Sequence, residues 1–172
     1  MNISSFVVLA AMVVSQPTAA DELPLALVHA KSSPLKVSRV VRENDLFAEF
    51  KGTIWVTGSL IVEWYGNDKS EPEYLLVPDR ESKKRLPHFA RYSVRWIGIT
   101  NGEEAFQRAG GNIVAVRGNS GDAKFSKITG SFEISNYVVG VECDSPWARA
   151  VIVRSDIPNQ SLVAGLNSPE RC

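Results

Sequence analysis

The sequence predicts an all-β domain, either a small curled barrel or a two-sheet sandwich, with one short helix. The first observation behind this prediction is residues 52–65, where apolar and polar side chains alternate with the period of two that is typical of a half-buried strand. The second is a series of shorter alternating stretches separated by segments rich in Gly, Asn, Asp and Pro. Only residues 103–109 show the signals of a helix.

Residues 52–65 would form the longest strand of the domain, with two different faces. The apolar face would carry Ile54, Val56, Leu60, Val62 and Trp64, and the other face Thr53, Trp55, Thr57, Ser59, Glu63 and Tyr65. Gly58 interrupts the apolar face near its middle, where a glycine lets a strand bulge or bend. Because about fourteen residues exceed the usual strand length, we expect this strand to serve two parts of a curled sheet.

The remaining elements follow the same reasoning. Residues 35–41 and 46–50 would be one broken strand or a hairpin through Glu43-Asn44-Asp45, and residues 79–86 a charged connection. A hairpin is expected at Asp144-Ser145-Pro146. The Thr100-Asn101-Gly102-Glu103 spacing matches a capping box, and Gly110-Gly111 is a stop signal, which together predict the helix over 103–109. Further strands are predicted at 73–77, 89–100, 112–117, 125–134, 137–143 and 147–154.

The element order of residues 52–134 is a long bent strand, two strands, a short helix and two more strands. This order resembles the OB-fold, a five-stranded barrel. The resemblance implies that the strands before residue 52 and after residue 134 are additions to the barrel. A two-sheet sandwich of seven to nine short strands is the alternative.

The first twenty residues have the pattern of a secretory signal peptide. Residues 6–14 form an apolar run too short to span a bilayer, and the small residues Thr18 and Ala20 predict cleavage before Asp21. A buried N-terminal strand is the alternative. We therefore expect one domain over residues 21–172, periplasmic or secreted, with no transmembrane segment.

Charge and cysteine content narrow the function classes further. The chain has 19 basic and 19 acidic residues, and this balance argues against a nucleic-acid partner or another general polyanion. Export would place Cys143 and Cys172 in an oxidising compartment. We predict a disulfide between them that ties the C-terminal tail to the domain.

Catalytic chemistry has little support in the sequence. His29 and His88 are the two histidines, and none of the common hydrolase or zinc motifs is present. We therefore predict no catalytic residue, no metal site and no cofactor. One enzyme alternative is a small hydrolase that uses Asp79, Ser82 and His88 of the charged 79–88 loop.

Binding is the favoured function. Trp55 and Tyr65 lie on the mixed face of the long strand, and Arg91 and Arg95 on the polar face of the 89–100 strand. Aromatic and Arg side chains supply much of the energy at recognition sites. We expect these four residues to bind a protein, such as the target of an inhibitor or immunity factor, or a glycan, in the envelope or outside the cell. If Trp55 does not bind a partner, the alternative is that the N-terminal segment or the C-terminal tail covers it. A purely structural accessory domain is a further alternative for the function.

Overall fold

The computed structural model of the chain describes residues 26–42, 46–64, 71–111, 124–158 and 162–165, with the side chains of 124 and 162–165 left out. Two helices and ten strands lie in these ranges. They are β1 (Leu27–Val28), β2 (Lys36–Val41), β3 (Leu46–Lys51), β4 (Ile54–Trp64), β5 (Glu73–Pro78), α1 (Arg80–Arg85), β6 (His88–Phe89), β7 (Ile97–Ile99), α2 (Gly102–Arg108), β8 (Lys124–Glu142), β9 (Ser145–Asp156) and β10 (Leu162–Gly165).

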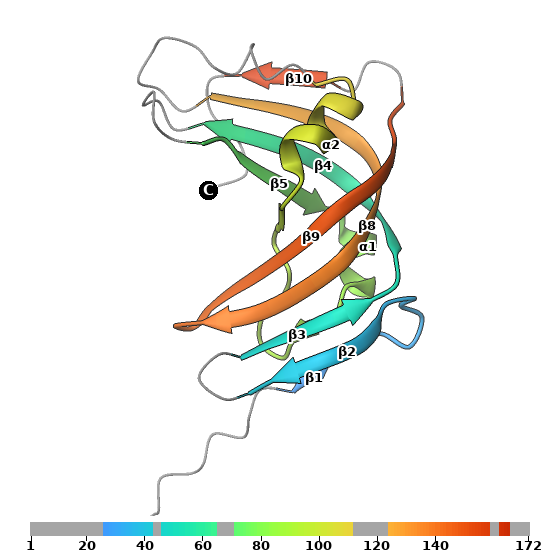
Figure 1. The fold of residues 1–172 in the computed structure, drawn as a ribbon, viewed down its shortest axis with the longest axis vertical. Helices are drawn as coiled ribbons and strands as arrows, with labels where there is room; N and C mark the ends of the chain where they lie inside the picture. The colour runs from blue at the N-terminus through green and yellow to red at the C-terminus, as the bar shows by residue number, and fades with distance from the viewer. Residues whose placement is uncertain (1–25, 43–45, 65–70, 112–123, 159–161, 166–172) are drawn as a thin grey trace, which may run out of the picture.

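Five strands close into a ring, so the domain is an all-β barrel rather than a two-sheet sandwich. β4 pairs with β8 and β5, β5 pairs with β7, β7 lies parallel to β9, and β9 returns to β8. The β2–β3 hairpin adds to the far half of β8, below the ring in Figure 1. α2 falls between the third and fourth ring strands, as the OB-like order predicts, but the fifth strand is β9. The OB-like part therefore extends to Asp156.

The predicted facing of the long strand is confirmed. Ile54, Val56, Leu60 and Val62 are buried in the barrel core, whereas Trp55 is exposed on the outer face. Trp64, expected on the core face, is half-buried and packs against the core. At the other end of the outer face Ser59 and Glu63 are buried despite their polarity.

Gly58 and Gly130 mark the place where the barrel wall turns sharply. They are paired across β4 and β8, so both face the same side of the sheet. A Cβ atom on Gly58 would lie 2.1 Å from the Val77 carbonyl oxygen, and one on Gly130 would lie 2.7 Å from the Asp156 carbonyl oxygen. Only glycine allows neighbouring backbone to approach this closely, and both strands curve strongly in Figure 1.

β8 is one strand where the sequence predicted two. Residues 125–134 and 137–143 are joined through a bulge, since the pairing with β9 shifts between Ser135 and Val138, and Asn136 has a φ of 49°. The following hairpin turn is Cys143-Asp144 rather than residues 144–146. Both turn residues have positive φ, 46° and 60°, as in the type I′ turns that match the right-handed twist of the flanking strands.

The predicted strand over 89–100 is wrong in its middle. Only β6 and β7 are strands, and they are joined by an irregular connection of residues 90–96, which we call the β6–β7 connection. Arg91 has a φ of 75°, which breaks the extended conformation. The alternation is therefore lost, and Trp96 is 42% exposed.

The charged segment 79–86 contains a helix that the sequence analysis missed. Asp79 caps α1 by accepting a hydrogen bond from the Ser82 backbone N–H (2.7 Å), the usual role of Asp at this position. α2 was expected and begins one residue early, but the capping box is absent. The Thr100 hydroxyl donates to the Ala150 carbonyl instead (3.3 Å), and the Asn101 side chain exchanges two hydrogen bonds with the Ile152 backbone.

The N-terminal part adopts the hairpin alternative. β2 and β3 are antiparallel around residues 43–45, which lie outside the described residues, and β1 pairs with β6. Leu35 is fully buried, but Val37 and Val40 on the edge strand β2 are exposed. The predicted signal peptide and the predicted strand 112–117 also lie outside the described residues. Within the described ranges, no helix has both the length and the apolar character needed to cross a membrane.

The structure gives no support to the predicted Cys143–Cys172 disulfide. Cys143 is an exposed free thiol, and Cys172 lies outside the described residues. β10 runs antiparallel to β8, with Gly165 opposite Phe125, so it leads away from the hairpin that carries Cys143 (Figure 1).

Candidate binding site

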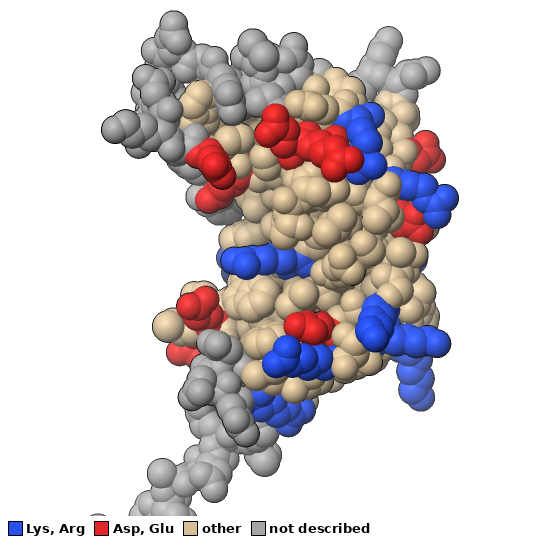
Figure 2. Space-filling view, viewed as in Figure 1, with Lys and Arg blue, Asp and Glu red and all other residues tan. Residues whose placement is uncertain are grey.

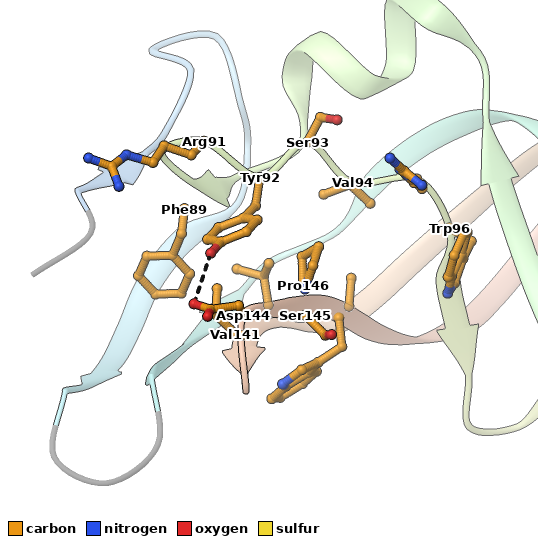
Figure 3. Close-up of a pocket in the computed structure, with 15 residues that line it drawn as sticks. Phe89, Arg91, Tyr92, Ser93, Val94, Trp96, Val141, Asp144, Ser145 and Pro146 are labelled. Atoms are coloured by element: carbon orange, nitrogen blue, oxygen red, sulfur yellow. Dashed lines mark hydrogen bonds between the residues drawn. The ribbon is translucent and has the colours of Figure 1, made fainter.

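The β6–β7 connection and the β8–β9 hairpin enclose a cavity of about 440 Å³. The cavity lies where the hairpin extends beyond the closed ring, and the connection crosses this part of the hairpin (Figure 3). Its volume is within the range of small-molecule and side-chain pockets.

The walls of the cavity are apolar. Val139, Val141 and Ala148 line it from the hairpin, and Tyr92 and Val94 line it from the connection. Val94, Val139 and Ala148 are buried, while Tyr92 and Val141 are partly buried and pack against the core. A guest in this cavity would therefore meet aliphatic and aromatic surface.

The rim of the cavity carries two basic residues and one acidic residue. Exposed residues on it include Arg91, Arg95, Trp96, Asp144 and Ser145. The Tyr92 hydroxyl points from the connection to Asp144 of the hairpin turn, with the oxygens 3.5 Å apart (Figure 3). Arg91 is directed away from the hairpin, and Trp96 lies at the opposite end of the connection. The two arginines outnumber the one acidic rim residue, Asp144, so the rim offers a cation to an anionic group of a ligand.

Buried contacts hold the two walls in place. The hydroxyl of Tyr137, fully buried on β8, donates to the Pro87 carbonyl (2.9 Å), which fixes the start of the connection to the hairpin strand. Burial raises the pKa of Tyr137, so this hydroxyl keeps its proton and remains a donor. On the other face of the hairpin the Trp147 ring covers Gly140, where a Cβ atom would lie 2.4 Å from the ring. The Arg149 guanidinium stacks over that ring at 5.4 Å.

Of the four predicted binding residues the structure describes three, and it does not bring Trp55 together with the two arginines. Arg91 and Arg95 line the cavity. Trp55 is 40% exposed on the outer face of β4, away from the cavity lining. Tyr65 lies outside the described residues. Arg91 and Arg95 were expected on the polar face of an 89–100 strand, and they lie instead on the irregular β6–β7 connection.

The surroundings of Trp55 form a separate polar surface. The Arg85 side chain of α1 donates to the Trp55 carbonyl oxygen (2.7 Å). Across the sheet, Trp55 pairs with Glu133 and Glu133 pairs with Arg154. The Glu133 carboxylate accepts hydrogen bonds from the Arg154 Nε (2.6 Å) and the Thr53 hydroxyl (2.9 Å). These hydrogen bonds lower the pKa of Glu133.

The residues of the hydrolase alternative have structural roles. Asp79 caps α1, and the buried Ser82 hydroxyl accepts a hydrogen bond from the Thr57 backbone N–H (3.0 Å), which docks the helix on β4. The His88 ring nitrogen Nδ1 lies 3.2 Å from the Leu86 carbonyl oxygen. Since the serine hydroxyl serves the β4 backbone and the aspartate serves a helix N-terminus, this arrangement does not favour nucleophilic catalysis.

Charged side chains are distributed unevenly on the face shown in Figure 2. Acidic side chains gather over α2, which carries Glu103 and Glu104 in its first turn, and basic side chains are prominent over the β2–β3 hairpin. The part of the chain that the structure describes contains no cluster of three or more His, Cys, Asp or Glu side chains suited to a metal ion.

Comparison with family models, curated proteins and solved structures found no match for this chain. Its function is therefore inferred from its own geometry.

Sequence reasoning missed the hairpin half of the cavity. Val139, Val141 and Ala148 fell within predicted strands to which no facing was assigned, and Asp144 and Ser145 were expected as turn residues. Tyr92 and Asp144 are 52 residues apart, and no sequence pattern indicates that the connection would cover the hairpin. Among the residues that line the cavity, the sequence singled out only Arg91 and Arg95 as candidates for binding, because both were expected on the polar face of a strand.

Proposed function

We propose that this chain is an exported β-barrel module that binds a partner protein at the cavity between the β6–β7 connection and the β8–β9 hairpin. The observation that supports the proposal is the combination of aliphatic walls, formed by Val94, Val139 and Val141, with the basic rim of Arg91 and Arg95. An apolar side chain of the partner would enter the cavity. An acidic group beside it would meet the arginines, which pair well with carboxylates.

A protein partner suits this cavity better than a glycan. Sugar hydroxyls placed against valine side chains would lose water without gaining hydrogen-bond partners, and each such loss costs about 1–3 kcal/mol. The exposed Trp96 at the rim adds an aromatic anchor of the kind found at protein interfaces. Export to the periplasm or the medium is part of the proposal and is supported by the signal-peptide pattern of residues 1–20.

The proposal is tested by selecting a random displayed peptide library on the immobilised protein. We expect an enriched consensus in which an apolar residue stands beside Asp or Glu. Arg95→Glu should weaken the selected peptide at least tenfold, the equivalent of about 1.4 kcal/mol, and Trp96→Ala should also weaken it. Arg80→Glu is the matched control, because it makes the same charge change at an exposed position in the first turn of α1, where an acidic residue is favoured.

Three outcomes would contradict the proposal. They are the absence of any consensus, a consensus whose affinity is the same for Arg95→Glu and Arg80→Glu, and capture of oligosaccharides at the cavity in place of peptides. The last outcome would favour the glycan alternative for this site.

A further inference from the structure

We infer that the outer face of β4, β8 and β9 around Trp55 is a second binding site, which takes a pyranose unit of an uncharged polysaccharide. This site is separate from the cavity and does not depend on the function proposed for it. It rests on two neighbouring rows of side chains that cross the three strands.

The first row supplies an aromatic surface and a fixed guanidinium. It runs from Trp55 through Glu133 to Arg154. The Glu133 side chain is only 8% exposed and holds the Nε of Arg154, whose side chain is 72% exposed. The terminal nitrogens of Arg154 are therefore turned to solvent in a restricted orientation. Trp55 and Arg154 are two strand spacings apart, about 10 Å, which leaves room for one sugar ring with its substituents.

The second row supplies hydroxyl groups and a carboxylate. It runs from Thr57 through Ser131 to Asp156. The Thr57 and Ser131 hydroxyl oxygens are 3.0 Å apart, and Asp156 is exposed at the end of the row. Carboxylate, guanidinium and hydroxyl groups together offer the mixture of acceptors and donors that the neighbouring hydroxyls of a sugar require.

The charge balance of the surface favours an uncharged ligand. Within the two rows Arg154 is offset by Glu133 and Asp156, so the side chains that would contact the ligand carry no excess of positive charge, and the basic side chains of α1 lie outside these rows. A polyanion would gain little here. The surface also lacks the contiguous apolar centre of a protein interface, since Trp55 is the single large apolar side chain exposed in these rows. A pyranose ring has one apolar C–H face for the indole and a polar edge for the remaining groups.

The test measures binding of soluble uncharged oligosaccharides to the purified protein by calorimetry. The panel contains gluco-, manno- and chito-oligosaccharides, with polygalacturonate and heparin as acidic probes. We expect at least one uncharged series to bind. Trp55→Ala should weaken that series at least tenfold, and Trp55→Phe should retain part of the affinity.

Trp96→Ala is the matched control, because Trp96 is as exposed as Trp55 but lies on the cavity rim. It should leave sugar affinity unchanged while weakening the peptides selected at the cavity, so failure of one site is distinguishable from failure of the other. If Trp55→Ala does not fold, Asp156→Asn provides a second variant that should weaken sugar binding several-fold. The inference is overturned if no uncharged series binds, if the acidic probes bind instead, or if neither Trp55→Ala nor Asp156→Asn changes the affinity.

Discussion

Glu133 shows how one residue can serve both stability and recognition. Its carboxylate is nearly buried on the barrel surface and is held by Thr53 and Arg154. Because a buried carboxylate without such partners would be costly, these hydrogen bonds fix the ionised form. They also fix the direction of Arg154, which the sugar site requires.

The stability of the protein should therefore depend on pH through Glu133. The Arg154 and Thr53 hydrogen bonds lower the pKa of Glu133 below its ordinary 4.5, so the unfolded chain binds its proton at a higher pH than the folded chain does. The stabilisation is complete above the ordinary pKa and is lost as the pH falls through the folded pKa. Urea unfolding at pH 7, 5, 4 and 3 should show Glu133→Gln less stable than the parent at pH 7, with a difference that narrows toward pH 3. Parallel pH profiles for the two proteins would contradict this role.

Residue-level features that depend on alternation were predictable, and those that depend on distant partners were not. Alternation placed Trp55 outside and Val56 inside, as the structure has them. It gave no indication that the Ser82 hydroxyl would accept a hydrogen bond from the Thr57 N–H, because that contact joins a helix to a strand 25 residues away.

At the level of elements, two paired glycines determine the shape of the barrel wall. Gly58 and Gly130 allow β4 and β8 to bend where β5 and β9 cross closely. The sequence analysis identified Gly58 as the bend of the long strand. It divided β8 in two at Ser135-Asn136, because a pair of polar residues with turn propensity is typical of the end of a strand. In the structure this pair lies at a bulge within one continuous strand.

Gly58→Ala should be strongly destabilising, since its Cβ would lie 2.1 Å from the Val77 carbonyl oxygen. Backbone must move to relieve this contact, and we expect a loss of at least about 2–3 kcal/mol in the free energy of unfolding. Gly98→Ala on β7 is the control, because its Cβ would find the nearest atom at 3.5 Å; it should change stability by less than about 1 kcal/mol. Chemical denaturation of both variants measures the contrast, and equal stabilities would show that the wall does not require Gly58.

At the scale of the whole molecule, the barrel and its additions have different roles. The first three strands of the ring, β4, β5 and β7, and the helix after them follow the element order that the sequence predicted, whereas the fourth and fifth strands are β8 and β9 rather than residues 112–117 and 125–134. The cavity lies beyond the ring, where the β8–β9 hairpin leaves the ring and the β6–β7 connection covers it. The positions of most strands were predictable from local alternation and turn residues. The cavity was not, because it forms between segments about fifty residues apart in the chain.

The central claim is that this cavity is where the protein binds its partner, and an NMR titration with the selected peptide tests it most directly. Amide shifts should concentrate in residues 89–96 and 139–148, with those of β4 near Trp55 unchanged. If the shifts fall outside the connection and the hairpin, or are spread over the β4 surface, the cavity is not the site of binding and the account is wrong.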